Sequence, residues 1–120
     1  MSLIFVYGTL KRGGSNHHHL EGQRFVATAR THPAFYLYEL EGYPGLVPAG
    51  DGGGRSIVGE IWDVDAACLA RLDLLEGVAE NVYARAPIPL LPPHDQTPVL
   101  GYLYQRSVAN RRELGESWPA

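Results

Sequence analysis

The sequence predicts a mixed α+β fold, in which a small mixed β-barrel carries one main flanking helix. Short runs of branched and aromatic residues are typical of strands, and 14 Gly and nine Pro residues punctuate the 120-residue chain. Only one stretch, 66–75, has the spacing of an amphipathic helix. A doubly wound α/β fold needs a helix after nearly every strand, so this pattern excludes it.

The length favours a single domain over residues 1–120. A chain of this size buries roughly two-thirds of its unfolded surface, enough for one core without metal or disulfide. Hydrophobic residues make up 45% and charged residues 19%, which is typical of a globular protein and not of a disordered one. The sequence turns polar from about residue 109, so we expect a loosely ordered tail there.

The first half of the chain contains strands and one loop of special interest. An apolar run over 3–7 predicts a buried strand that ends at Gly8. The loop 8–16 follows, and Asn16 is placed to cap a short helical turn reaching Leu20. Further strands are predicted over 24–29, 35–40 and, after a turn at 41–45, 46–47.

The second half contains the best strand and the helix. Residues 56–64 alternate in the manner of a strand, and Asp65 stands where a helix N-cap belongs. Leucines recur every third residue from 69 to 75, which predicts a helix over 66–75, and Gly77 is placed to end it. Two more strands are predicted over 83–91 and 99–104, on either side of a Pro-rich loop.

The net charge and the cysteine content indicate which partners and which cellular location to expect. A net charge of −3 gives no general attraction to nucleic acid or to an anionic membrane. No apolar run reaches about 18 residues, and the N-terminus has no basic leader, so neither a membrane span nor a signal peptide is expected. Cys68 is the only cysteine, which favours a reducing, cytoplasmic location. The expected partner is a small molecule or a protein, and the oligomeric state is undetermined.

The turn after the first strand is a candidate anion-binding site. Tyr7, Gly8, Thr9 and Leu10 lead the strand into a glycine turn, where successive backbone N–H groups can converge on a carboxylate. The alternative interpretation of the same residues is an ordinary loop start.

Glu76 is the candidate acid or base. It stands at the C-terminal end of the predicted helix, where the helix dipole disfavours a further negative charge. A partly apolar site would raise its pKa further above the reference of about 4.3, towards the range useful for proton transfer. A solvated surface carboxylate is the alternative, and Asp73, one turn earlier, is either its partner or another surface acid.

Other reactive residue types carry weaker signals. The three adjacent histidines 17–19 point in different directions on any regular backbone, so we expect structural or surface roles and no metal site. Cys68 lies beside the leucine stripe and is expected to be a small buried hydrophobe. Tyr83 and Arg85 share one face of their strand, as Tyr102 and Tyr104 do, so each pair faces either a common cavity or the core.

Taken together, these motifs resemble the gamma-glutamylcyclotransferase-like family, and most closely its gamma-glutamylamine cyclotransferase branch. The most specific of them are Tyr7-Gly8-Thr9-Leu10 and Leu72-Asp73-Leu74-Leu75-Glu76-Gly77, in this order. The remaining matches are 11–13, 16–17, Pro44, 46–47, 58–61, 83–85 and 102–104. The likeness runs from Leu3 to about Tyr104.

The resemblance implies a small barrel fold and a cyclisation reaction that needs no metal or organic cofactor. It assigns Glu76 as general acid/base. It assigns binding of the gamma-glutamyl group to Tyr7, Gly8, Thr9 and Leu10, and we add Tyr83 and Arg85 as candidates from their strand face. The expected products are 5-oxoproline and a free amine. The loops 50–55 and 91–98 have no matching motif, and we expect them to border the leaving-group side.

Two other functions fit the same residues. A non-catalytic relative would keep the cavity and bind a glutamate-like ligand without turnover, because a fold alone does not determine an activity. A cyclotransferase that removes a gamma-glutamyl protecting group in a biosynthetic pathway would use the same chemistry on a different substrate.

Overall fold

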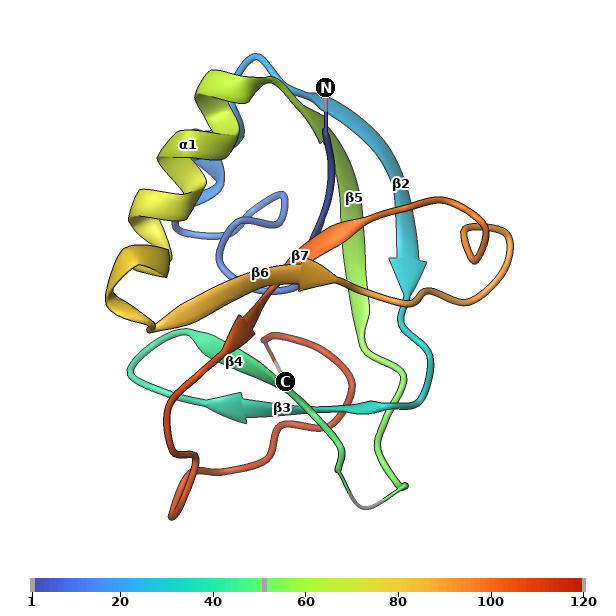
Figure 1. Ribbon diagram of the computed structural model, residues 1–120, viewed down its shortest axis with the longest axis vertical. Coiled ribbons are helices and arrows are strands. Elements are labelled where there is room, and N and C mark those ends of the chain that lie inside the picture. Colours follow the sequence, from blue (N-terminus) through green and yellow to red (C-terminus); the bar gives the residue numbers. More distant parts are fainter. Residues whose placement is uncertain (1, 51, 120) are drawn as a thin grey trace.

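The computed structural model describes residues 2–50 and 52–119, and its strands and helices follow one another as Figure 1 shows. One α-helix and two short 3₁₀ helices, η1 and η2, interrupt seven strands. In chain order, the elements are β1 (Ser2–Val6), η1 (His17–Leu20), β2 (Arg24–Arg30), β3 (Phe35–Glu39), β4 (Pro44–Pro48), β5 (Val58–Val64), α1 (Ala66–Leu75), η2 (Val78–Glu80), β6 (Tyr83–Pro87) and β7 (Leu100–Tyr104).

The strands form a five-stranded sheet in the order β2-β5-β1-β7-β6 and a separate two-stranded sheet of β3 and β4. The central strand β1 is antiparallel to β5, with Phe5 opposite Ile61, and parallel to β7, with Ile4 opposite Leu100. The α+β class with one main helix is therefore confirmed. The backbone ladders of the described residues form two sheets rather than one continuous barrel.

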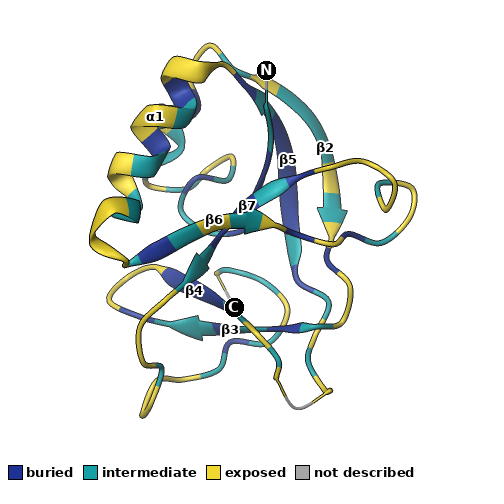
Figure 2. Ribbon diagram, viewed as in Figure 1, coloured by how far each residue is buried: buried dark blue, intermediate teal, exposed yellow. Residues whose placement is uncertain are grey.

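The core lies on both faces of β1, which explains why this strand is apolar without interruption. Ile4 and Val6 face a cluster that includes Cys68 and Leu72 of α1. Their neighbours in sequence face the opposite cluster, because side chains alternate along a strand. That second cluster joins the five-stranded sheet to the β3–β4 hairpin and includes Phe5, Tyr7, Leu37, Leu46 and Ile61. Figure 2 shows the resulting dark, buried stretches of β5 and β4.

The helix α1 begins and ends where the sequence predicts. The Asp65 carboxylate accepts a hydrogen bond from the backbone N–H of Cys68 at 2.8 Å, and Gly77 adopts the left-handed conformation (φ 64°) that ends the helix. Cys68 and Leu72 are fully buried, whereas Leu75 at the end of the predicted stripe is 40% exposed. The buried role expected for Cys68 is confirmed.

The prediction that Asn16 caps the short helical turn was wrong. It stands at the N-cap position of η1, but its side chain makes no capping hydrogen bond. Its Nδ2 instead donates to Oγ1 of Thr9 at 3.0 Å, within the loop that follows β1. Strand ends also differ: β6 stops at Pro87, and Leu90 makes an isolated bridge to Thr31.

The C-terminal segment is tied to the rest of the fold by backbone hydrogen bonds, in contrast to the loosely ordered tail that we expected. The N–H of Leu114 donates to the carbonyl of Leu37 at 2.7 Å, and the N–H of Val58 donates to the carbonyl of Glu116 at 2.8 Å. Leu114 is buried in the cluster around Leu37. The polar composition of this segment did not reveal that its apolar side chains Leu114 and Trp118 pack against the core.

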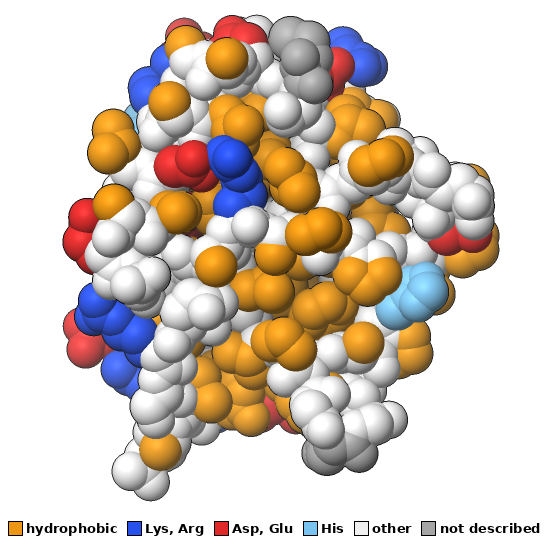
Figure 3. All heavy atoms as spheres, in the orientation of Figure 1, with side chains coloured by type: hydrophobic (Ala, Val, Ile, Leu, Met, Phe, Trp, Pro, Cys, Tyr) orange, Lys and Arg blue, Asp and Glu red, His pale blue; other side chains and the backbone are white. Residues whose placement is uncertain are grey.

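On the face shown in Figure 3, hydrophobic side chains gather over the centre, and most charged side chains lie along the left and upper edges. In the described ranges of the chain, no helix is both long and apolar enough for a membrane span.

Candidate functional site

The first wall of the site is the end of β1, where Tyr7 is fixed by two hydrogen bonds. Its buried hydroxyl donates to the carbonyl of Tyr102 at 2.7 Å and accepts from the N–H of Leu46 at 3.3 Å. Tyr7 therefore links β1 to β7 and to the β3–β4 hairpin. Burial raises the pKa of the Tyr7 hydroxyl well above its ordinary value.

The loop after Tyr7 turns sharply and leaves three backbone donors free. The N–H of Lys11 donates to the carbonyl of Gly8, and the N–H of Asn16 donates to the carbonyl of Thr9. Within the part of the chain that the structure describes, the N–H groups of Gly8, Thr9 and Leu10 donate no hydrogen bond. We call these three groups the amide cradle, because successive unpaired amides form a site for an anion.

Gly8 has no space for a side chain. A Cβ there would lie 2.6 Å from Cγ and 2.8 Å from Cδ of Pro44 in the β3–β4 hairpin. The close approach of the hairpin to this loop therefore requires glycine at position 8.

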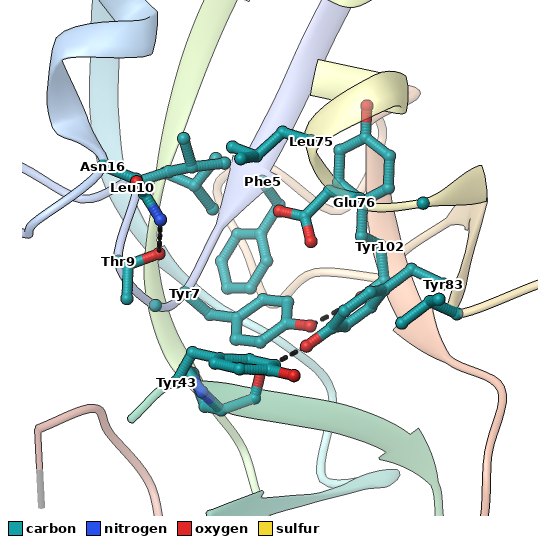
Figure 4. Close-up of a pocket in the computed structure, with 15 residues that line it drawn as sticks. Phe5, Tyr7, Thr9, Leu10, Asn16, Tyr43, Leu75, Glu76, Tyr83 and Tyr102 are labelled. Carbon is teal, nitrogen blue, oxygen red and sulfur yellow. Dashed lines mark hydrogen bonds between the residues drawn. The ribbon is translucent and has the colours of Figure 1, made fainter. Parts of the chain in front are cut away.

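The second wall is the C-terminal end of α1, which carries Glu76. The N–H of Glu76 donates to the carbonyl of Leu72 at 2.9 Å, and the left-handed Gly77 then turns the chain away. Figure 4 shows the Glu76 carboxylate pointing into the space between Leu75, Phe5 and Tyr102. The side chain is half-buried, and burial raises its pKa to about 7.

No nearby hydroxyl opposes this rise in the pKa of Glu76. Four tyrosines line the same pocket, and three of them, Tyr7, Tyr83 and Tyr102, donate their hydroxyl protons to other acceptors. The acceptors are the Tyr102 carbonyl for Tyr7, the Pro44 carbonyl for Tyr83 (2.8 Å) and Asp73 Oδ1 for Tyr102 (2.7 Å). Over residues 2–50 and 52–119, the Glu76 carboxylate receives no hydrogen bond that would favour its charged form.

These walls enclose one pocket of about 320 Å³. It contains most of the residues that sequence reasoning singled out: Tyr7, Gly8, Thr9, Leu10, Tyr83 and Glu76. The other lining residues are Phe5, Val6, Asn16, Tyr43, Pro44, Leu75, Gly77, Val82 and Tyr102. A half-buried carboxyl group with a raised pKa, in the same pocket as backbone N–H groups that have no acceptor, has the chemistry to transfer a proton beside a bound anion.

Arg85 is the one predicted binding residue that lies outside this lining. Its Nη1 pairs with Oδ2 of Asp73 at 2.7 Å, and Oδ1 of the same carboxylate accepts the Tyr102 hydroxyl. Arg85 thus reaches the site only through two other side chains. Sharing a strand face with Tyr83 was not sufficient, because the nearby carboxylate holds the guanidinium.

The sequence matches a described family over nearly its whole length. The family model "Gamma-glutamyl cyclotransferase, AIG2-like" matches residues 4–120. The chain belongs to this family.

Curated relatives and a solved structure agree with the family model. A Vibrio cholerae relative is 46% identical over 76 residues, which cover 63% of each chain. The zebrafish (Danio rerio) protein "Gamma-glutamylaminecyclotransferase A" is 37% identical over 94 residues, covering 72% of this chain and 57% of the relative. The chain therefore spans less than two-thirds of the length of these two relatives. A mouse AIG2-like crystal structure matches with a TM-score of 0.78 and 30% identity, covering 98% of this chain and 88% of the mouse chain.

Sequence reasoning missed several walls of this cyclotransferase-family pocket. Tyr43 and Pro44 were part of a predicted turn, and Leu75 was assigned to the buried helix stripe. The hairpin brings Tyr43 and Pro44 to the site, and the end of α1 turns Leu75 towards it. A signal for Pro44 did exist, since it is one of the residues that carry the family resemblance.

The loops at 50–55 and 91–98 also differ from expectation. Their described residues take no part in lining the pocket. Leu91, Pro92, Pro93 and His94 instead border a second hollow beside β2 and β5. Other segments therefore form the walls of the pocket.

The side chains of histidines 17–19 make contacts within the fold. Nδ1 of His17 lies 2.9 Å from the carbonyl of Leu10, and its ring stands edge-on to Trp62 at 5.2 Å. The rings of His18 and His19 contact each other. Among the described residues, no group of three His, Cys, Asp or Glu side chains is placed to hold a metal ion.

Proposed function

We propose that the protein is a gamma-glutamyl cyclotransferase that converts a gamma-glutamyl amine or amide into 5-oxoproline and a free amine. The observation that carries the proposal is the placement of a carboxyl group with a pKa of about 7 in the same pocket as the amide cradle. Family membership supports the general activity, and the name of the zebrafish relative supports an amine as leaving group.

The amide cradle binds the α-carboxylate of the gamma-glutamyl group. Three N–H groups without a protein acceptor satisfy the oxygens of one carboxylate, and neutral donors can do so without a lysine or arginine. Tyr7 and Gly8 hold the cradle in place through their contacts with β7, β4 and Pro44. Binding at this end directs the γ-amide towards Glu76, in the opposite wall of the pocket.

Glu76 moves the proton that the cyclisation requires. As a carboxylate, it takes a proton from the α-ammonium group of the substrate. The freed amine attacks the γ-carbonyl carbon, the ring closes, and the C–N bond to the leaving amine breaks. Glu76 returns this proton to the departing nitrogen. It then takes the second proton, which the ring nitrogen must lose to become the lactam N–H, and passes it to the released amine, which leaves as an ammonium ion. Atoms and charge therefore balance, and Glu76 is again a carboxylate.

The reaction requires little more than orientation and one group that transfers a proton. Both reacting groups belong to the same substrate, so holding the chain in a bent conformation replaces a collision by an intramolecular attack. No metal or organic cofactor takes part in the proposed steps. We also propose a cytoplasmic location, based on the single, buried cysteine.

A substrate panel tests the proposal. The folded protein is incubated with gamma-glutamyl-ε-lysine, several gamma-glutamyl alkylamides and several gamma-glutamyl amino acids, and 5-oxoproline is quantified. Release of 5-oxoproline from at least one class is expected. If the whole panel stays intact while glutamate-like ligands bind, the protein is a ligand-binding relative and the proposal is rejected.

A further inference from the structure

Asp73 accepts hydrogen bonds from two neighbouring strands with its two carboxylate oxygens. Its Oδ1 accepts the hydroxyl of Tyr102 in β7 at 2.7 Å, and its Oδ2 accepts Nη1 of Arg85 in β6 at 2.7 Å. Tyr102 and Arg85 lie directly opposite each other in the register of these strands, so both side chains reach the carboxylate from one face of the sheet. Because both oxygens are engaged, the orientation of the Asp73 carboxylate is fixed.

These two hydrogen bonds lie where the apolar packing of α1 ends. Leu72 is fully buried, whereas the last two residues of the helix, Leu74 and Leu75, are 79% and 40% exposed. Glu76 follows Asp73 by three residues, so the two side chains are neighbours on the helix surface. Asp73 therefore anchors the final turn of α1, from which Glu76 projects.

Tyr102 connects this anchor to the opposite wall of the pocket. Its hydroxyl bonds Asp73, and its backbone carbonyl accepts the hydroxyl of Tyr7 at 2.7 Å. Tyr7 immediately precedes the amide cradle. In Figure 4, the Tyr102 hydroxyl points towards the helix and away from Tyr7. Two successive hydrogen bonds thus link the helix end that carries Glu76 to the strand end that carries the cradle.

The cradle has supports that do not depend on Asp73. Tyr7 and the Tyr102 carbonyl link β1 and β7, which are neighbouring strands of the five-stranded sheet. The Glu60 carboxylate also holds the loop, because it accepts the backbone N–H of Arg12 at 3.0 Å. Removal of the Asp73 carboxylate therefore takes two hydrogen bonds from the end of α1 and none from the cradle loop.

We propose that Asp73 is a positioning residue, which sets the place of the Glu76 carboxylate relative to the amide cradle through Tyr102 and Arg85. The inference rests on the proposed function and deepens it, since Asp73 lies outside the pocket lining and acts through other residues. Proton transfer requires the two heavy atoms to lie about 2.6–3.2 Å apart. A misplacement of about 1 Å can lower a rate about 100-fold.

The variant Asp73→Ala tests this role by removing both hydrogen bonds. Its kcat for release of 5-oxoproline, measured with the best substrate of the panel, should fall at least about tenfold. Its dissociation constant for 5-oxoproline itself, measured by calorimetry, should change less than about twofold, because the cradle binds the carboxylate of this product. Asp73→Asn keeps an oxygen acceptor and a similar shape, so it should recover most of the lost kcat.

A second variant keeps the test valid should Asp73→Ala fail to fold. Arg85→Met removes one of the two hydrogen bonds and keeps the aliphatic part of the side chain. It should lower kcat several-fold and leave 5-oxoproline binding unchanged. Arg71→Ala is the matched control, because Arg71 is an exposed charged residue of the same helix outside the pocket lining. It should leave kcat unchanged.

A double-mutant cycle separates positioning from a general loss of stability. Tyr102→Phe removes the hydroxyl that Asp73 accepts, so it should lower kcat in the wild-type background and have little further effect in Asp73→Ala. Each kcat is divided by the fraction of molecules that bind 5-oxoproline. A merely structural role would lower turnover and binding capacity alike and would leave this corrected kcat unchanged.

The outcomes separate the two levels of the proposal. A corrected kcat for Asp73→Ala within about twofold of wild type, or additive effects in the cycle, overturns the positioning role and leaves the cyclotransferase function standing. Weakening of 5-oxoproline binding as large as the loss of kcat also overturns it. Absence of turnover by the wild-type protein over the whole substrate panel overturns the cyclotransferase function, and this inference with it.

Discussion

The Glu60 carboxylate accepts two hydrogen bonds from Arg12. Its Oε1 accepts the backbone N–H of Arg12 at 3.0 Å, and its Oε2 accepts Nε of the same residue at 3.1 Å. Glu60 lies directly opposite Val6, the last residue of β1, so one buried carboxylate holds the loop close to the point where it leaves the sheet. Nε1 of Trp62 donates a third hydrogen bond to Oε1 at 3.1 Å. The amide cradle lies within the loop that this contact closes.

We predict that Glu60→Ala lowers the free energy of unfolding by about 1–3 kcal/mol, since it leaves the Arg12 N–H and the Trp62 indole without their acceptor. It should also raise KM for a gamma-glutamyl substrate more than it lowers kcat, because the cradle loses its support. Arg12→Ala is the control: it removes the exposed guanidinium and keeps the backbone hydrogen bond, so its effect on KM should be small. Equal KM values in Glu60→Ala and wild type would contradict this role.

The pH dependence of stability gives a second test at Glu60. Burial raises the pKa of this carboxyl, but the hydrogen bonds from Arg12 and Trp62 outweigh burial and hold the pKa below its usual value of 4.5. A lowered folded-state pKa stabilises the protein above the unfolded pKa, and this stabilisation is lost as the pH falls through the folded value. The stability difference between wild type and Glu60→Gln should therefore shrink below about pH 4.5. Urea unfolding at several pH values measures it.

We predict that Glu76→Gln lowers kcat for 5-oxoproline release by at least about 100-fold, because a glutamine cannot accept or return the proton. The change is isosteric, so the fold and the binding of a glutamate-like ligand should persist. Glu80→Gln is the matched control, since Glu80 is exposed and lies four residues further along the chain. A kcat for Glu76→Gln comparable with that of Glu80→Gln would show that another group is the base.

The raised pKa of Glu76 predicts the acidic limb of the activity profile. The base must be ionised to accept the substrate proton, so kcat/KM should fall as the pH drops below about 7. A limb centred near the ordinary glutamate pKa of 4.5 would contradict burial as the cause.

The free energy of unfolding should change with pH in the opposite direction to the activity, because the folded state holds the Glu76 proton more tightly than the unfolded state does. Wild type should lose stability relative to Glu76→Gln as the pH rises from about 4.5 to about 7.

We predict that Gly8→Ala impairs the site more than an alanine at a glycine with free space. The added methyl group would overlap Pro44, so either the loop or the hairpin must move and the amide cradle is displaced. Gly50→Ala is the control, because no atom lies within 4 Å of a Cβ at position 50. We expect KM to rise at least about tenfold in Gly8→Ala, in line with a loss of more than about 1 kcal/mol. Unchanged kinetics in both variants would show that the Gly8–Pro44 contact is dispensable.

Interactions between residues close in sequence could be predicted well. The helix over Ala66–Leu75, its cap at Asp65 and its termination at Gly77 all depend on contacts within a few residues. The sequence likewise places Glu76 at the end of that helix and Gly8 in a turn after a buried strand. Both features depend on neighbouring residues alone, so the sequence is sufficient to predict them.

Only the tertiary structure decided how these parts combine. The pocket joins the end of β1, the end of α1 and the turn of the separate β3–β4 hairpin, and these parts meet only when the hairpin and the helix pack against the five-stranded sheet. Arg85 lies outside because Asp73 of α1 pairs with it, and Asn16 leaves its cap position to bond Thr9. Tyr43 and Leu75, which both line the pocket, are 32 positions apart in sequence. Local preferences act over a few residues, whereas burial and charge pairing depend on distances that only the folded chain defines.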